Sequence, residues 1–110
     1  MNDEIPIGAL DRRIRIEAPV RTDDGAGGAT VTWHTVARAW ARVEAVSASG
    51  RDRAGRLDGI ATLRVTIRAR DGVASGQRIV LDERVLSIHA TRPLGRGDRY
   101  LVLEAEEEGR

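Results

Sequence analysis

The chain has 110 residues, of which 41% are hydrophobic and 32% are charged, and its formal net charge is +1 at pH 7. This length suits one domain with one core, and the apolar fraction argues against a disordered chain. All 18 basic residues are arginine, and the absence of cysteine excludes disulfides and thiol nucleophiles. The aromatic residues are Trp33, Trp40 and Tyr100, so we expect an aliphatic core.

The amino-terminal stretch MNDEIPIGAL carries acidic residues where a secretory signal needs basic ones. No apolar run approaches the roughly 20 residues of a membrane helix. We therefore expect a protein that is made in the bacterial cytoplasm and has no membrane partner.

Hydrophobic alternation predicts the first two strands. Residues 12–18 place Ile14, Ile16 and Ala18 on one face, and we expect Pro19 to end this strand. Residues 21–30 form a glycine-rich turn, in which Asp23-Asp24 caps the turn rather than binding a metal. The second strand covers residues 30–46, with a bend near His34 and Thr35.

An interruption of glycine, arginine and aspartate follows, and alternation then resumes. The third strand is the clearest in the chain, with Leu63, Val65 and Ile67 on one face. A hairpin follows with Asp82-Glu83 at its tip, and then a last strand with an acidic tail. The ranges are 47–59 for the interruption, 59–70 for the third strand, 77–91 for the hairpin, 99–106 for the last strand and 106–110 for the tail.

Six strands with turn signals between them predict an all-β fold, a small antiparallel β-barrel or sandwich with a long loop between strands 2 and 3. We expect one domain over residues 1–110, with a core at 7–107, a mobile loop at 47–59 and a tail at 108–110.

The sequence predicts no catalytic, cofactor or metal site. Ser87 and His89 share a strand face, but no oxyanion-hole motif accompanies them. The carboxylates lack the apolar setting that acid–base catalysis needs. We expect a protein that is not an enzyme and needs no cofactor.

Two clusters of arginine stand out. One is on the third strand, where we expect an exposed face paired with Glu44 or Glu17; it consists of Arg64, Arg68 and Arg70. The other is in the interruption and suits a polyanion such as DNA, or an acidic partner surface; it consists of Arg51, Arg53 and Arg56. Small folds rarely keep so long a loop without using it, unless it is disordered.

Several segments together resemble a known family. In order along the chain they are IGALDRRIRIEAP, DDGAGG, TWHTVARAWARVEAVSASG, VTIRAR and RIVLDERVLSIHA. With this order and spacing, over about residues 7 to 107, the chain resembles the bacteriophage head-closure family, also called head–tail joining or stopper proteins. Asp11-Arg12 departs from the family pattern.

The resemblance implies a β-barrel subunit of a sixfold or twelvefold homo-oligomeric ring in the neck of a phage, prophage or gene transfer agent particle. The implied partners are further copies of the chain, a portal or adaptor protein, a tail terminator or tail-completion protein, and packaged double-stranded DNA in the channel. The implied location is the virion or phage-like particle.

From this we form the hypothesis that residues 47–59 are the channel gate. Arg51, Arg53 and Arg56 would face DNA or a neighbouring subunit, and the hinges would be Gly50, Gly55 and Gly59. The alternative is a free-standing small β-barrel that binds nucleic acid, although such folds usually stack bases on exposed aromatic residues. Aromatic residues are few here, and we expect at least one tryptophan in the core.

Overall fold

The computed structural model describes residues 10–46 and 62–107, which form six β-strands and a short 3-10 turn. The elements are β1 Arg12–Asp23, β2 Ala29–Ala45, β3 Thr62–Arg68, β4 Arg78–Leu81, β5 Arg84–Leu94, η3 Arg96–Asp98 and β6 Tyr100–Glu107. The described residues include no helix that could span a membrane.

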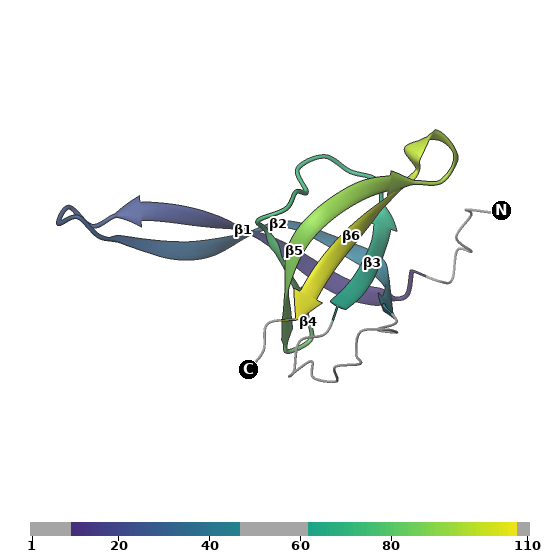
Figure 1. The fold of residues 1–110 in the computed structure, drawn as a ribbon, viewed down its shortest axis with the longest axis horizontal. Coiled ribbons are helices and arrows are strands. Elements are labelled where there is room, and N and C mark those ends of the chain that lie inside the picture. Colours follow the sequence, from purple (N-terminus) through teal and green to yellow (C-terminus); the bar gives the residue numbers. More distant parts are fainter. Residues whose placement is uncertain (1–9, 47–61, 108–110) are drawn as a thin grey trace, which may run out of the picture.

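The six strands hydrogen-bond in a closed cycle, β1-β2-β3-β6-β5-β4, and every neighbouring pair is antiparallel. The sheet curls into a small barrel from which the β1–β2 ribbon projects (Figure 1). The predicted all-β class and the number of strands are confirmed, and the barrel form is the one that the structure adopts.

The inside of the barrel is filled by aliphatic side chains, as expected for so small a barrel. Leu63, Val65 and Ile67 of the third strand are buried as predicted, and so are Ile14 and Ile16 of β1, whereas Ala69, which the alternation also places inward, is exposed. Ile79 faces Leu86 across the β4–β5 hairpin, whose turn lies at Asp82 and Glu83 as predicted. The buried cluster consists of Ile14, Ile16, Ala37, Ala41, Leu63, Val65, Ile67, Ile79, Leu81, Leu86, Ile88, Leu103 and Ala105.

The prediction that Pro19 ends the first strand is wrong. β1 continues to Asp23, and Pro19 is the register partner of Trp33 in β2. Past Glu17, β1 pairs with β2 and with no other described strand, so each strand of this ribbon has an edge that no other described strand covers. An edge position tolerates proline because the missing N–H is not needed by a neighbour.

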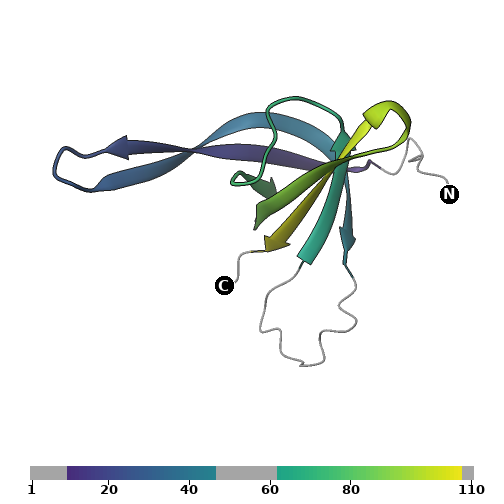
Figure 2. The same ribbon diagram turned by 45° about the horizontal axis from the view of Figure 1, so that its top comes forward.

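This two-stranded ribbon, residues 18–34, is named the arm here. It extends well beyond the barrel in both views (Figures 1 and 2). At its tip, Asp24 Oδ1 accepts hydrogen bonds from the backbone N–H groups of Ala26 and Gly28, at 2.8 and 3.0 Å. These two bonds lower the pKa of Asp24, so Asp24 caps the turn as predicted.

A β-bulge marks the base of the arm. Ile16 pairs with Ala37 whereas Glu17 pairs with Thr35, so Val36 is the extra residue of β2. The predicted bend near His34 and Thr35 is this bulge. Bulges increase strand twist, which suits the place where β1 and β2 leave the barrel.

Part of the acidic segment at the carboxyl end of the chain belongs to a strand. Glu106 and Glu107 belong to β6, where they pair with Ser87 and Leu86 of β5. Strand pairing therefore extends further toward the carboxyl terminus than the acidic run suggests.

Candidate functional site

The interval that the sequence marks as a gate begins where β2 ends. The backbone N–H of Val46 donates to the carbonyl oxygen of Thr62 at 3.0 Å, so the end of β2 and the start of β3 lie side by side. The predicted gate residues lie outside the described residues; they are Gly50, Arg51, Arg53, Gly55, Arg56 and Gly59. Their role stays a prediction.

The arginines of the third strand have different surroundings. Arg64 lies in register between Glu44 of β2 and Glu104 of β6, and its Nε is buried without a hydrogen-bond partner. Glu44 instead binds Arg42, at 3.1 Å. Thus Glu44 is the cross-strand neighbour of Arg64, as expected, but its carboxylate forms its ion pair with Arg42 instead.

On the other side of β2, arginines face one another across the β1–β2 ladder. Arg13 of β1 is the register partner of Trp40, and Arg15 is the partner of Arg38. Register partners project from the same face of a sheet. All four side chains therefore lie on the outer surface of the barrel, with Ala39 and Ala41 facing inward.

Arg68 and Arg70 extend this group from the end of β3. Continued past its last pair, the β2–β3 register brings Arg68 beside Trp40 and Arg70 beside Arg38. Arg70 Nη1 donates to the carbonyl oxygen of Arg38 at 3.4 Å, which places it there. The group is named the basic face and consists of Arg13, Arg15, Arg38, Trp40, Arg68 and Arg70.

Trp40 lies at the middle of the basic face and is 52% exposed. The guanidinium carbon of Arg13 lies 4.8 Å from the centre of its ring, a cation–π contact. Within residues 10–46 and 62–107, Arg15 is the one arginine of this face with an ion pair, to Glu17 at 2.9 Å. In the part of the chain that the structure describes, the face thus combines four arginines that have no paired carboxylate with an exposed aromatic ring. The expectation of a core tryptophan is wrong, because Trp33 too is only partly buried and is not part of the core cluster.

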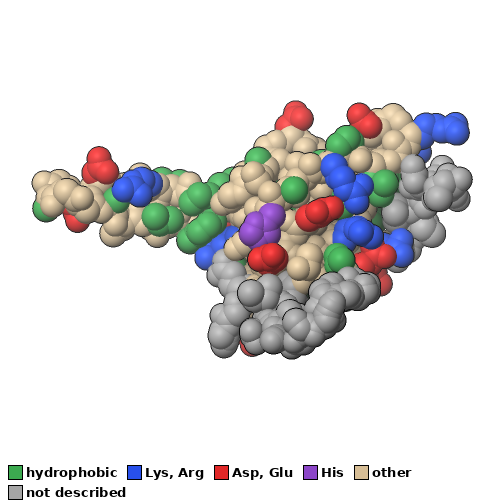
Figure 3. Space-filling view, in the orientation of Figure 1, with side chains coloured by type: hydrophobic (Ala, Val, Ile, Leu, Met, Phe, Trp, Pro, Cys, Tyr) green, Lys and Arg blue, Asp and Glu red, His purple; other side chains and the backbone are tan. Residues whose placement is uncertain are grey.

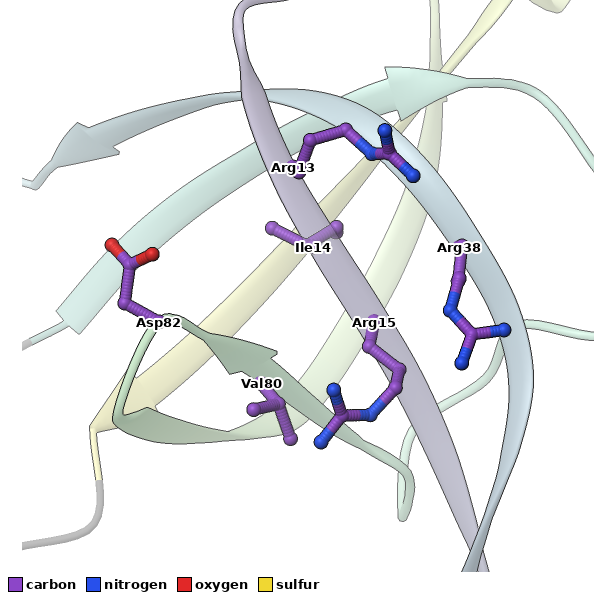
Figure 4. A pocket seen from close by; sticks show the side chains of 6 residues that line it. All are labelled: Arg13, Ile14, Arg15, Arg38, Val80 and Asp82. Atoms are coloured by element: carbon purple, nitrogen blue, oxygen red, sulfur yellow. The ribbon is translucent and has the colours of Figure 1, made fainter.

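Two hollows lie in the basic face. The first has a volume of about 230 Å³ and is lined by Arg13, Ile14, Arg15, Arg38, Val80 and Asp82 (Figure 4). The second has a volume of about 200 Å³ and is lined by Leu10, Ala39, Trp40, Arg68, Ala69 and Arg70. Four of the six residues that line the second hollow are apolar and two are arginine, the composition of a contact surface for another protein.

Glu17 is a carboxylate buried at the base of the arm. Arg15 Nε and Arg78 Nε donate to its two oxygens at 2.9 and 2.8 Å. The hydrogen bond from Arg15, with a smaller contribution from Arg78, lowers the pKa of Glu17 despite its burial. Arg78 also stacks on Trp33, 4.2 Å from the ring centre. This cluster fastens the arm to the barrel.

The outer surface of β5 and β6 is acidic and internally paired. On this surface Arg92 forms an ion pair with Glu104 at 3.3 Å, and His89 Nε2 lies 3.2 Å from Glu106 Oε1. Arg84 pairs with Glu107 at 2.8 Å at the end of the strands, where Glu107 is the register partner of the buried Leu86. In Figure 3, acidic and basic side chains alternate over the barrel beside a histidine. The bidentate hydrogen bond from Arg84 lowers the pKa of Glu107. His89 is held by a carboxylate here, which gives the Ser87-x-His89 spacing a structural explanation.

Charge is divided between the two halves of the barrel. Within residues 10–17, 35–46 and 62–71, which hold the barrel parts of β1 to β3, there are eight arginines and four carboxylates. Within residues 78–107, which hold β4 to β6 and η3, there are five arginines and six carboxylates. The excess of arginine in the described chain therefore lies on the β1–β3 side of the barrel.

Potential metal ligands do not gather in the described part of the chain, where no group of three or more His, Asp or Glu side chains could hold an ion. The notable features are outer surfaces: the basic face, the paired acidic surface and the projecting arm. Such features define a small all-β protein built for contacts with other macromolecules.

The chain belongs to the phage head completion protein family, whose pattern it matches over residues 5–108. It is similar to protein SF1141 from Shigella flexneri 2a, with 30% identity, a TM-score of 0.70, and coverage of 94% of this chain and 96% of that one. It is also similar to a chain in the virion of a native gene transfer agent particle, with 30% identity, a TM-score of 0.69, and coverage of 91% and 96%. No curated protein matches it.

The family that the sequence resembles and the location in a phage-like particle are thereby confirmed. Family membership assigns the chain a structural role in the head and neck region of such a particle.

Proposed function

We propose that the chain is a head-closure subunit that forms a ring in the particle neck, between the portal or adaptor protein and the tail. This ring closes the DNA channel after packaging and offers a surface to which the tail-completion protein attaches. The observation that carries the proposal is the family match across nearly the whole chain, from residue 5 to residue 108. The likeness to a gene transfer agent virion chain supports it.

The gate is proposed to be residues 47–59. The 3.0 Å bond between Val46 and Thr62 ties both ends of this interval to a closed barrel. A segment anchored in this way can change position without disturbing the core. In this proposal the arginines of the interval meet DNA phosphates or the carboxylates of a neighbouring subunit, and its glycines act as hinges.

The proposal contains no chemical step. The subunit acts by occupying the channel and by holding partners in register, so its binding surfaces are its working parts. This accounts for the contrast between an aliphatic core and charged outer faces.

Deletion of residues 49–57 tests the gate. The purified variant should retain the circular dichroism spectrum of the all-β barrel, because no described strand is touched. Particles that carry it should fill with DNA and then lose it, as measured by the nuclease-sensitive fraction of packaged DNA. Replacement of Arg51, Arg53 and Arg56 by serine keeps the length of the interval. This variant therefore separates the effect of the interval's charge from the effect of its length.

Filled and stable particles from the deletion variant would contradict the gate. For the ring and its place in the neck, the test is a particle preparation that lacks the protein, in which tailless heads are expected in negative-stain images. Tailed particles of normal yield, together with salt-dependent binding of short DNA by the isolated chain, would instead favour a free-standing nucleic-acid-binding barrel.

A further inference from the structure

We propose that the basic face of one copy of this chain binds the acidic surface of β6 on the next copy, and that this head-to-tail contact is the lateral contact of the ring. The acidic surface is defined by Glu104 and Glu106 on the outer side of β6. The inference rests on the proposed function, and it adds which two faces meet.

The first argument is charge complementarity within one chain. Four of the five arginines in the basic face have no carboxylate within ion-pair distance among the described residues, while the outer side of β6 presents Glu104 and Glu106. Glu104 and Glu106 have side chains that are 43% and 45% exposed. A carboxylate has lone pairs for several donors, so the existing partners Arg92 and His89 leave it able to accept another arginine.

The second argument is the composition of the basic face. Trp40 is exposed to 52% beside a hollow with Leu10, Ala39 and Ala69 in its lining. Tryptophan and arginine are enriched at protein interfaces, and buried anchors of these types carry much of the binding energy. A DNA backbone would use the arginines but would leave Trp40 and the apolar lining uncovered, which favours a protein partner.

The third argument is geometry. A contact between two different faces of identical subunits is heterologous, and it generates a closed ring when the rotation between subunits allows. In a ring of six, the two neighbours of a subunit lie at about 120° to each other. β2, the centre of the basic face, and β6 are separated by one strand, β3, in the six-strand cycle. That spacing is about one third of the barrel circumference, which suits such a ring.

The absence of native cysteine allows a direct test by cross-linking. Arg38→Cys marks the basic face and Glu104→Cys marks the acidic surface; both replace exposed side chains. The two variants, mixed at about 1 mM so that even a millimolar contact is half formed, are treated with a short bismaleimide. The expected product is a dimer that joins Arg38→Cys to Glu104→Cys, with little product from either variant alone.

A matched control is Arg96→Cys, which replaces an exposed arginine of η3, outside the basic face. Mixed with Glu104→Cys, it should give only background cross-linking. Arg70→Glu, added to the Arg38→Cys chain, should lower the yield of the mixed dimer at least about fivefold, and so should about 0.5 M salt, because the contact is electrostatic. Circular dichroism verifies that each variant is folded.

Three results would overturn the inference. One is a mixed-dimer yield no higher than that of the Arg96→Cys control. Another is a dominant Arg38→Cys homodimer, which would mean that two basic faces meet. The last is binding of a duplex of about 20 base pairs that Arg70→Glu abolishes, without mixed dimers, which would assign the face to DNA. Rings or DNA retention seen in particles despite such a result would leave the proposed function standing.

Discussion

Glu17 lies at the junction between the barrel and the arm, and it is only 7% exposed. A buried carboxylate is tolerated when it is paired and hydrogen-bonded. Here two arginines from two strands, Arg15 and Arg78, supply both conditions. Simple alternation places Glu17 on the solvent side of β1. It does not show that Arg78, stacked on Trp33, reaches that position, because these two residues come from β4 and β2.

Glu17→Gln tests this cluster. The variant should lose about 2–3 kcal/mol of unfolding free energy at pH 7, because two arginines lose their shared anion. Since the folded pKa of Glu17 is lowered, its contribution is complete above the pKa of the unfolded chain. That contribution is lost as pH falls through the folded pKa. The difference between wild type and variant should therefore shrink in acid.

Urea denaturation at pH 7 and at about pH 3 measures both effects. Glu83→Gln is the control, because Glu83 is exposed at the β4–β5 turn. An equal difference between wild type and Glu17→Gln at both pH values would show that packing rather than charge explains the loss.

Among the strands, those joined by short turns were the most predictable. The β4–β5 hairpin follows from alternation on both sides of Asp82-Glu83, and its register agrees. The arm was not predicted, because proline is expected to end a strand that has neighbours on both sides. Alternation also does not report how many neighbours a strand has, so it cannot separate a ribbon from a barrel wall.

Shortening the arm tests its independence from the barrel. Replacing residues 20–32 with Asn-Gly joins Pro19 to Trp33 through a tight turn and keeps the Glu17 cluster. The unfolding free energy should change by no more than about 1 kcal/mol, because a two-stranded ribbon is marginally stable on its own. In the full chain, backbone amides of the arm should exchange with solvent far faster than those of β6.

Urea denaturation and hydrogen exchange give these quantities. A loss of more than about 3 kcal/mol would mean that the arm stabilises the barrel. If stability is kept, the arm is free to serve contacts outside the monomer, which fits a chain whose family builds phage heads.

At the scale of the whole molecule, the sequence was sufficient for the class and the core but not for closure. Local hairpins follow from neighbouring patterns, whereas the β1–β4 and β3–β6 pairings join distant segments. The basic face was missed for the same reason: its arginines come from three strands, and only the barrel brings them together. Of the predicted strand cluster Arg64, Arg68 and Arg70, only Arg68 and Arg70 belong to this face. Sequence reasoning instead placed the candidate site in residues 47–59, outside the described residues.

The β1–β4 seam closes the barrel with the shortest ladder, three register pairs centred on Ile16 and Ile79. Ile79 has no exposed surface and also faces Leu86 of β5. Ile79→Val should lower the unfolding free energy by about 0.5–1.5 kcal/mol and Ile79→Ala by about 2–5 kcal/mol. Domains of this size have a free energy of unfolding of about 5–15 kcal/mol. Ile79→Ala should therefore remove a large part of the stability of the barrel. Val80→Ala, on the outer side of the same strand, should cost under about 1 kcal/mol. If urea denaturation showed Ile79→Ala to be no worse than Val80→Ala, the seam would not be what holds the barrel closed.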